Sequence, residues 1–333
     1  MATTVTSAFN EFLRDKVNLD KEQVTKATNS KTWLTGKVHA FPIHDSSFPE
    51  LYSEKDISFG SFARKTKKRR LDDIDMMFCL SAMGGTYNEY AHDNIEITIN
   101  PDNKALNNLC DTLTNKLNSI KVVNKFVSSL ANIPQYKNAE INRRQEAAVL
   151  NLTSYDWSFD IVPCFFTMED YNNKTFYLIP NGSGNWKKTD PRIDKNKVTT
   201  INQNNSGNVL NVIRIMKYWN KRQTMPTMSS YLIENMILNH YEYRTDANSY
   251  VDVNLPDIFL YIKNNIYNSV QDPKGIQGNI NNLTYDEKTK IYNRADLDYQ
   301  RSYDARRLET AGQHKESINR WREIFGSDFP TYG

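Results

Sequence analysis

Three aspartates have the spacing and surroundings to hold divalent cations. Asp73 and Asp75 lie one residue apart in "LDDIDMMFCLS" (71–81), which begins charged and ends apolar, as does a strand that runs into a core. Side chains at i and i+2 of a strand face the same side, and two adjacent carboxylates repel unless a cation lies between them. Mg²⁺ prefers such oxygen ligands. Asp160 is a lone charge in the apolar run "WSFDIVP", so we predict it as the third ligand that a two-metal site requires.

Two further aspartates compete for this role. Asp72 has the opposite strand parity from Asp73 and Asp75, so we expect it to face away. Asp156 precedes the predicted strand that contains Asp160 and is expected to be a cap or turn residue.

A strongly basic run, residues 64–70, precedes the aspartates and contains six Lys and Arg residues in seven positions. Such a run is typical of a solvated loop or of a nuclear-import or nucleic-acid patch. The formal net charge of the chain is only +3, and its pI of about 8.5 is modest for a nucleic-acid-binding protein. We therefore expect most of the six to be solvated, in a spacer whose positive field attracts anionic substrates.

Composition excludes several other kinds of site. Cys79, Cys110 and Cys164 are far apart, with no CxxC pair, so neither a disulfide framework nor a zinc cluster is indicated, and we expect all three to be buried. The five histidines are scattered. Only 12 of 333 residues are glycine, which argues against a glycine-rich phosphate loop. Without a long apolar run or an apolar leader, the chain is expected in the cytoplasm, with no membrane partner.

Apolar periodicity predicts an α+β half followed by a helical half. Residues 3–36 have helical spacing and indicate one long helix, or two joined near Asn18. The strand and helix signals that follow are strands near 56–62, 71–81 and 94–100, a helix over 101–118, and strands over 147–152 and 157–166. From about residue 207 the pattern is helical, with two helices covering 284–325, and the Asn-rich stretch 202–208 is the predicted linker. We therefore predict domains at 1–201 and 202–333, with a small-molecule site in the cleft between them.

The order of these motifs resembles the DNA polymerase beta nucleotidyltransferase superfamily, in which Gly-Ser, then D-x-D, then a strand aspartate follow one another. More narrowly, the chain is similar to the bacterial CD-NTases, relatives of cyclic GMP-AMP synthase and oligoadenylate synthase. The resemblance extends over nearly the whole chain, through the stretches "DIVP", "NWKKTDPRI" (185–193), "VIRIMKYWNKR" (212–222), "SSYLIE" (229–234) and "HKESINRWREIFGSDFP" (314–330).

The resemblance implies a polymerase-beta-like core with a mixed sheet and a long N-terminal helix, followed by an oligoadenylate-synthase-like helical domain. It assigns metal binding and catalysis to Asp73, Asp75 and Asp160. It also implies that Gly60 and Ser61 hold nucleotide phosphates at a turn, that Lys217 and Ser230 contact the triphosphate, and that Tyr231 stacks on a base. A solvated helix face for Lys217 and a core position for Tyr231 are the alternatives.

The activity that the resemblance implies is Mg²⁺-dependent joining of NTPs. Two Mg²⁺ ions, replaceable by Mn²⁺, would assist a 2′- or 3′-hydroxyl in attacking the α-phosphate of ATP or GTP, with release of pyrophosphate. Asp160 would help to accept the proton. The expected product is a cyclic di- or trinucleotide such as cGAMP, made for antiphage (CBASS) defence without a nucleic-acid partner.

Further expectations concern partners and alternatives. The resemblance suggests conjugation through Gly333 by a ubiquitin-transfer-like partner. A second enzymatic interpretation is transfer of AMP to a tRNA, a protein or a small molecule. An interpretation from another class is a nucleic-acid-binding protein that uses the 64–70 basic patch.

Overall fold

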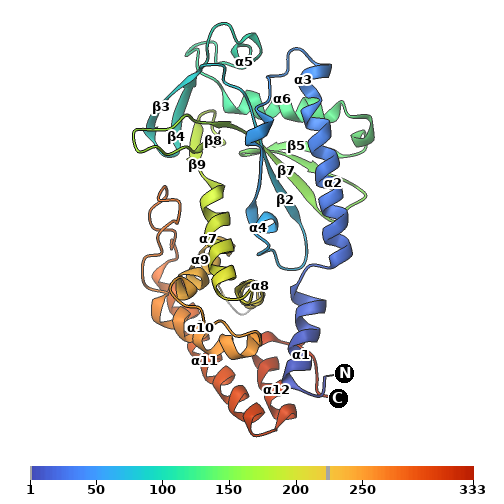
Figure 1. The fold of residues 1–333 in the computed structure, drawn as a ribbon, viewed down its shortest axis with the longest axis vertical. Coiled ribbons are helices and arrows are strands. Elements are labelled where there is room, and N and C mark those ends of the chain that lie inside the picture. Colours follow the sequence, from blue (N-terminus) through green and yellow to red (C-terminus); the bar gives the residue numbers. More distant parts are fainter. Residues whose placement is uncertain (1, 223–225) are drawn as a thin grey trace. The chain divides into compact units, whose positions relative to one another are not determined.

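The computed structural model describes residues 2–222 and 226–333, which form two compact units. The sheet unit consists of Glu22–Ala63 and Leu71–Asp194 (Figure 1). The helical unit contains the residues up to Lys21, the segment Arg64–Arg70 and Lys195–Gly333. This division differs from the predicted boundary at 201/202, because residues up to Lys21 and the basic segment make their contacts with the C-terminal helices.

The sheet unit is built on a mixed nine-stranded sheet. Its order is β1-β2-β7-β8-β9-β4-β3, with β6 pairing β7 and β5 pairing β6. Only β2 and β7 pair in parallel. The strands are β1 Ile57–Phe59, β2 Asp73–Cys79, β3 Thr86–Ala91, β4 Asn94–Thr98, β5 Glu140–Arg144, β6 Ala147–Asn151, β7 Ser158–Phe166, β8 Tyr177–Pro180 and β9 Trp186–Thr189.

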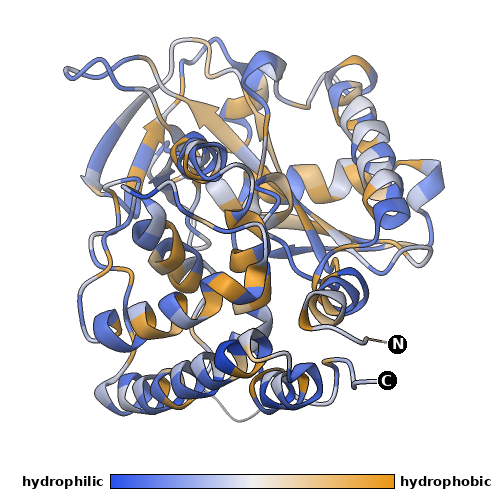
Figure 2. Cartoon of the chain, turned by 60° about the horizontal axis from the view of Figure 1, so that its bottom comes forward, coloured by the Kyte–Doolittle hydropathy of each residue, from blue (hydrophilic) through white to orange (hydrophobic). Residues whose placement is uncertain are grey.

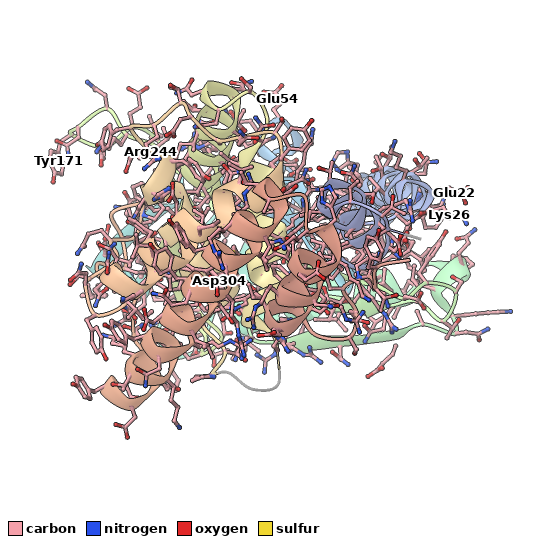
Figure 3. All side chains as sticks on the ribbon, turned by 90° about the horizontal axis from the view of Figure 1, so that it is seen from below. Glu22, Lys26, Glu54, Tyr171, Arg244 and Asp304 are labelled. Atoms are coloured by element: carbon pink, nitrogen blue, oxygen red, sulfur yellow. The ribbon has the colours of Figure 1, made fainter. Side chains whose placement is uncertain are left out.

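Helix α6 (Ser119–Ala131) packs against strands β5 to β8 of this sheet. Asn118 caps it, since its side chain accepts the Ile120 N–H at 3.0 Å and the Lys121 N–H at 3.2 Å. Its buried Phe126 ring lies 5.0 Å from that of Phe48. The other helices of the unit are α2 Lys21–His39, α3 Phe41–His44, α4 Gly60–Ala63 and α5 Lys104–Asn107. On α2, Glu22 and Lys26 lie one turn apart on an exposed side (Figure 3).

The helical unit packs α1 (Val5–Phe12) with the C-terminal helices around one apolar core. Phe9 of α1 meets the rings of Trp321 and Phe329 edge-on, each at 4.9 Å. A π-helical turn, Leu13–Val17, follows α1. The remaining helices are α7 Pro191–Asn204, α8 Val209–Asn220, α9 Ser230–Tyr241, α10 Val251–Asn265, α11 Tyr285–Thr310 and α12 His314–Phe325. Figure 2 shows α11 mainly in hydrophilic colours, as fits a helix with few buried residues.

Most of the predicted elements are confirmed, with two corrections. The N-terminal helical stretch is two helices interrupted after Val17, which confirms the alternative of two helices joined near Asn18. The helices over 207–325 are present, with α11 and α12 covering the predicted 284–325. The helix predicted over 101–118 is wrong, because that stretch holds only the short α5 and the long helix begins at Ser119. Strands β3, β5, β8 and β9 were not predicted. The three cysteines are buried, as expected. Among the described residues, no helix combines the length and apolar character needed to span a membrane.

The basic segment Arg64–Arg70 is held to the helical unit by a buried carboxylate. Glu234 of α9, 1% exposed, accepts from Arg64 Nε and from Thr66 Oγ1, each at 2.7 Å. Lys217 of α8, 3% exposed, donates to the same carboxylate and, at 3.2 Å, to the Thr66 carbonyl oxygen and hydroxyl. Burial alone would raise the pKa of Glu234, but the charges of Lys217 and Arg64 outweigh it and lower the pKa to about 2.

A second attachment lies at the other end of the segment. The Arg69 N–H donates to the Val17 carbonyl at 2.8 Å, and its guanidinium donates to the carbonyls of Asn18 at 2.9 Å and Arg14 at 3.3 Å. Only Lys65 and Arg70 of the six basic residues are exposed. The expectation that most of them are solvated is therefore wrong.

Replacing the buried carboxylate tests this attachment. Glu234→Gln should lower the free energy of unfolding at pH 7 by about 3–5 kcal/mol, because Lys217 then stays buried without its counter-charge. Urea unfolding followed by circular dichroism measures this. Glu242→Gln, an exposed position just past the same helix, should change it by less than about 0.5 kcal/mol. The double variant Lys217→Met, Glu234→Leu, which replaces the ion pair by apolar side chains, should lose less unfolding free energy than Glu234→Gln alone.

The loss of unfolding free energy caused by Glu234→Gln should also depend on pH. The folded pKa of Glu234, about 2, lies below its ordinary value of 4.5, so its stabilisation is complete above pH 4.5 and is lost as the pH falls toward 2. The difference in unfolding free energy between the wild type and Glu234→Gln should therefore narrow over that range. A difference that stays constant between pH 6 and pH 2.5 would contradict the assignment.

Candidate active site

The parallel pairing of β2 with β7 sets two of the predicted aspartates side by side. Asp75 is the direct partner of Asp160, and Asp73 is the partner of Ser158. Residues in register on neighbouring strands present their side chains on the same face of a sheet. Asp73, Asp75 and Asp160 therefore share one face, and each is half-buried, with Ile74 and Phe159 buried on the opposite face.

The rest of that face is apolar. Met77 and Cys79 continue β2 beyond the aspartates, and Val162 and Cys164 continue β7, all of them buried in one cluster. The carboxylates therefore occupy only the first part of the strand pair. This arrangement agrees with the sequence expectation of a strand that runs from a charged site into a core.

Gly60 stands directly against the Asp75 carboxylate. Strand β1 pairs antiparallel with β2, with Phe59 opposite Asp75, and Gly60 begins the short helix α4 immediately afterwards. Gly60 has a φ of +70°, which side chains disfavour, and a Cβ at this position would lie 1.7 Å from Asp75 Oδ2. Only glycine lets the turn approach this carboxylate so closely. Ser61, predicted to bind phosphate with Gly60, is the next residue and is half-buried.

The donor set of this face fits Mg²⁺. Asp73, Asp75 and Asp160 offer carboxylate oxygens alone, the ligands that Mg²⁺ prefers, and the lack of a Cβ at Gly60 lets the Asp75 carboxylate lie directly against the turn. In the described residues, no group of three or more His, Cys, Asp or Glu side chains is arranged so that it could hold a metal ion. The fit therefore rests on donor chemistry and strand register, and the metal remains a proposal.

The two competing aspartates lie outside the strands. Asp72 is exposed and precedes β2, while Asp156 is exposed in the bend before β7. Asp72 contributes its backbone carbonyl, which accepts the Ser158 N–H at 3.0 Å. Neither residue occupies the face defined by Asp75 and Asp160.

The three nucleotide contacts predicted in the helical unit have different surroundings. The Lys217 ammonium is bonded to Glu234 and Thr66, so the solvated alternative is wrong, and a phosphate contact would require it to exchange a partner. Ser230 is exposed at the first position of α9, next to the cap residue Ser229. Both contacts stay predictions.

Tyr231 belongs to a polar triad. Its hydroxyl donates to Asp272 Oδ1 at 3.0 Å and accepts from Lys274 Nζ at 2.5 Å. The Lys274 ammonium also lies 4.4 Å from the centre of the Tyr231 ring. One side of the ring is thus in contact with a cation from the same unit, and stacking of a base stays a prediction.

Sequence reasoning missed Glu234, Thr66 and the Asp272–Lys274 pair. Glu234 carried a usable signal, because it is a lone acid in the apolar run "SSYLIENMIL", the same kind of position that identified Asp160. Thr66 is the one uncharged residue in the basic run and the one fully buried there. The Asp272–Lys274 pair carries no comparable signal.

The terminal Gly333 lies beside the other end of the chain. Tyr332 forms a parallel bridge with Ala2, and the Gly333 N–H donates to the Ala2 carbonyl at 3.3 Å. Conjugation through Gly333 stays a prediction.

A methyl group at position 60 tests the contact with Asp75. Gly60→Ala should lower the free energy of unfolding by about 1–3 kcal/mol, since it adds the positive-φ cost and displaces the carboxylate. Gly36→Ala, in the exposed part of α2 with nothing within 4 Å, should instead raise it by about 0.5–1 kcal/mol.

A double-mutant cycle measured by urea unfolding isolates the clash. Asp75→Ala removes the two closest atoms, so Gly60→Ala should cost less in that background. Equal costs of Gly60→Ala with and without Asp75→Ala would show that the two residues do not interact as described.

The comparisons with known proteins agree with this architecture. No protein family model matches the chain. The chain is 47% identical to a probable cyclic nucleotide synthase of Bacillus cereus strain VD146, over all 333 residues and 99% of that protein.

Solved structures show the same fold at low identity. CdnC of Escherichia coli MS115-1 matches at a TM-score of 0.69 in its complex with HORMA-deltaN and 0.70 with ATP, at 17% and 16% identity over 98% of each chain. The cyclic AMP-GMP synthase DncV of Vibrio cholerae, described as a prokaryotic cGAS homologue, matches at a TM-score of 0.58 and 14% identity, over 84% of this chain and 70% of DncV. With near-complete coverage of a relative at 47% identity, the chain belongs to the bacterial CD-NTase family of cyclic nucleotide synthases and is a nucleotidyltransferase.

Proposed function

We propose that this nucleotidyltransferase joins ATP and GTP into a cGAMP-like cyclic di- or trinucleotide, a second messenger for antiphage defence, and releases pyrophosphate. The observation that carries the proposal is the register of β2 and β7, which sets Asp75 opposite Asp160 on the face that Asp73 shares. The glycine turn against Asp75 supports it, because backbone N–H groups of such a turn are suited to bind phosphate. A protein of this fold was solved with ATP, and another is a cyclic AMP-GMP synthase.

Each predicted site residue of the sheet unit has its own role in the proposed reaction. Asp73, Asp75 and Asp160 would hold two Mg²⁺ ions, with Mn²⁺ as a substitute, and bound there the metal would neutralise the charge that develops on the phosphates. Gly60 and Ser61 hold the triphosphate at the turn and orient its α-phosphate. Asp160, on the strand beside Asp75, accepts the proton of the attacking 2′- or 3′-hydroxyl.

The helical unit supplies the remaining nucleotide contacts of the proposal. Ser230, exposed at the N-terminal end of α9, offers its hydroxyl near backbone N–H groups, a suitable position for a phosphate oxygen. Tyr231, whose hydroxyl is fixed by Asp272 and Lys274, offers a ring to a base. Neither role needs a nucleic-acid partner.

Substitution of the aspartates tests the reaction. Purified protein is incubated with α-labelled NTPs and Mg²⁺, treated with phosphatase, and the resistant product is identified by mass spectrometry. Asp75→Asn and Asp160→Asn should each reduce its formation more than about 100-fold, because even outer-shell partners of a metal cost 10–100-fold. Asp72→Asn, beside the same strand but exposed and outside it, should retain activity.

Two outcomes would contradict the proposal. One is label found in RNA, in protein or in an added small molecule instead of a resistant product, which would identify an AMP transferase. The other is an equal loss of product formation in Asp72→Asn and Asp75→Asn, which would show that the face of β2 that carries Asp75 has no specific role in the reaction.

A further inference from the structure

A cavity of about 530 Å³ lies within the sheet unit, between one side of α2 and two connecting segments. Helix α2 contributes four residues whose i, i+3, i+4 and i+7 spacing places them on one side of the helix, namely Lys26, Asn29, Ser30 and Trp33. The one-turn helix Pro134–Tyr136 and the loop 152–155 complete the lining. A volume of this size is in the range of pockets that take small molecules.

Aromatic rings form much of this lining. The rings of Trp33 and Tyr136 meet edge-on, with their centroids 5.5 Å apart. The Lys37 ammonium lies 4.9 Å from the centre of the Trp33 ring and covers part of it. Tyr155 is 38% exposed and stacks with one face on Trp157, at 4.4 Å, and no other ring of the described residues contacts it. The second face of Tyr155 is therefore available to a planar ligand.

The Tyr136 hydroxyl is a polar group without a partner. Tyr136 is only 5% exposed and lines the cavity, yet its hydroxyl makes no hydrogen bond with the residues that the structure describes. Burial, followed by the nearby Tyr155, raises the pKa of Tyr136, so the hydroxyl keeps its proton and can donate. A buried hydroxyl without a partner costs free energy, which a ligand that accepts from it would recover.

The other polar groups of the lining are amides and one ammonium. Asn29 and Gln135 carry carboxamides that can both donate and accept, and neither side chain is hydrogen-bonded to a described residue. Lys26 is exposed and makes no ion pair within the described part of the chain. Glu22, one turn earlier on α2, is outside the lining, which contains no acidic residue among those described (Figure 3). The cavity thus combines a positive charge with hydrogen-bonding groups around aromatic rings.

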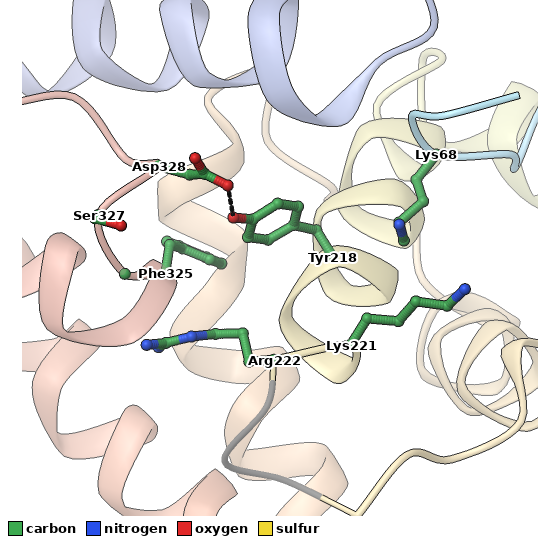
Figure 4. A pocket seen from close by; sticks show the side chains of 8 residues that line it. Lys68, Tyr218, Lys221, Arg222, Phe325, Ser327 and Asp328 are labelled. Atoms are coloured by element: carbon green, nitrogen blue, oxygen red, sulfur yellow. Dashed lines mark hydrogen bonds between the residues drawn. The ribbon is translucent and has the colours of Figure 1, made fainter.

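A cavity of similar volume in the helical unit has different surroundings (Figure 4). Its Asp328 accepts from the Tyr218 hydroxyl at 2.7 Å and from Lys16 Nζ at 2.9 Å. Its Lys68 donates to the carbonyl of Arg69 at 3.0 Å. These groups already belong to a network of the protein, whereas the Tyr136 hydroxyl and the two carboxamides beside α2 do not.

We propose that the cavity beside α2 binds a nucleotide, with its base against the open face of Tyr155 and its phosphate toward Lys26. Every base has a π-face, so an aromatic ring can stack on any of them. The carboxamides of Asn29 and Gln135 and the hydroxyl of Tyr136 suit the donors and acceptors at the edge of a base. None of these residues lies on the proposed catalytic face of β2 and β7. The binding is therefore independent of the proposed reaction.

Binding of AMP tests the site apart from catalysis. Protein carrying Asp160→Asn, without Mg²⁺ or NTP, is titrated with AMP by equilibrium dialysis. Tyr155→Ala should weaken binding about 5- to 150-fold, the effect of one base–aromatic stack. Tyr136→Phe should weaken it about 2- to 10-fold, the effect of one hydrogen bond. Tyr171→Ala, which changes a 94% exposed tyrosine outside the lining, should match the parent (Figure 3).

Two further measurements separate the base from the phosphate. AMP should quench the fluorescence of Trp33, which is 41% exposed, whereas the other four tryptophans are at most 5% exposed. Trp33→Phe should abolish this quenching. Adenosine should bind more weakly than AMP to the parent protein but about as well as AMP to Lys26→Met, because only the phosphate interacts with the ammonium.

Three results would overturn the proposal. The first is absence of AMP binding, or binding that is unchanged in both Tyr155→Ala and Tyr136→Phe. The second is loss of AMP binding in Tyr231→Ala with full binding in Tyr155→Ala, which would assign the nucleotide to the proposed base contact of the helical unit. The third is a short single-stranded RNA that binds through Tyr155 where AMP does not. Matching far-ultraviolet circular dichroism spectra establish that the variants are folded.

Discussion

The parallel pairing of β2 with β7 is the constraint on which the site depends. These are the only parallel neighbours in the sheet, and their register alone decides that Asp75 meets Asp160 and that Asp73 shares their face. A shift by one residue would turn the aspartates into the core and expose Ile74. The buried residues further along both strands oppose such a shift, because Met77, Cys79, Val162 and Cys164 fill one apolar cluster only in this register. The buried residues that stabilise the sheet therefore also fix the positions of the three carboxylates.

The chain between the glycine turn and the aspartates is equally constrained. Residues 64–70 join the contacts of the helical unit, although they connect two pieces of the sheet unit. The buried Glu234 explains this, since leaving either Lys217 or Arg64 without it would strand a positive charge away from water. The basic segment is thus a fixed structural part and not a tolerant spacer.

Sequence patterns predicted those parts whose signal is local. The aspartate spacing, the apolar strands at 147–152 and 157–166 and the C-terminal helices were recognisable, because burial of one face or of a whole strand leaves a periodic or continuous apolar run. Strands β3 and β5 were missed because they are exposed and polar, as in "TYNEYA" and "EINRR", and are held only by pairing. The boundary at Asn118 was misplaced because an asparagine that caps a following helix also suits the end of a preceding one. The Glu234 contacts join residues about 170 positions apart, which no local pattern reports.

The register of β2 and β7 is proposed to build one site for two cations from Asp73, Asp75 and Asp160. Binding of Mn²⁺ in the presence of NTP, measured by electron paramagnetic resonance on the wild type and single variants, tests it most directly. Asp75→Asn and Asp160→Asn should weaken Mn²⁺ binding to a similar extent, and Asp72→Asn should leave it unchanged. Wild-type Mn²⁺ binding in Asp160→Asn would contradict it, because the residue set opposite Asp75 would then play no part in the site.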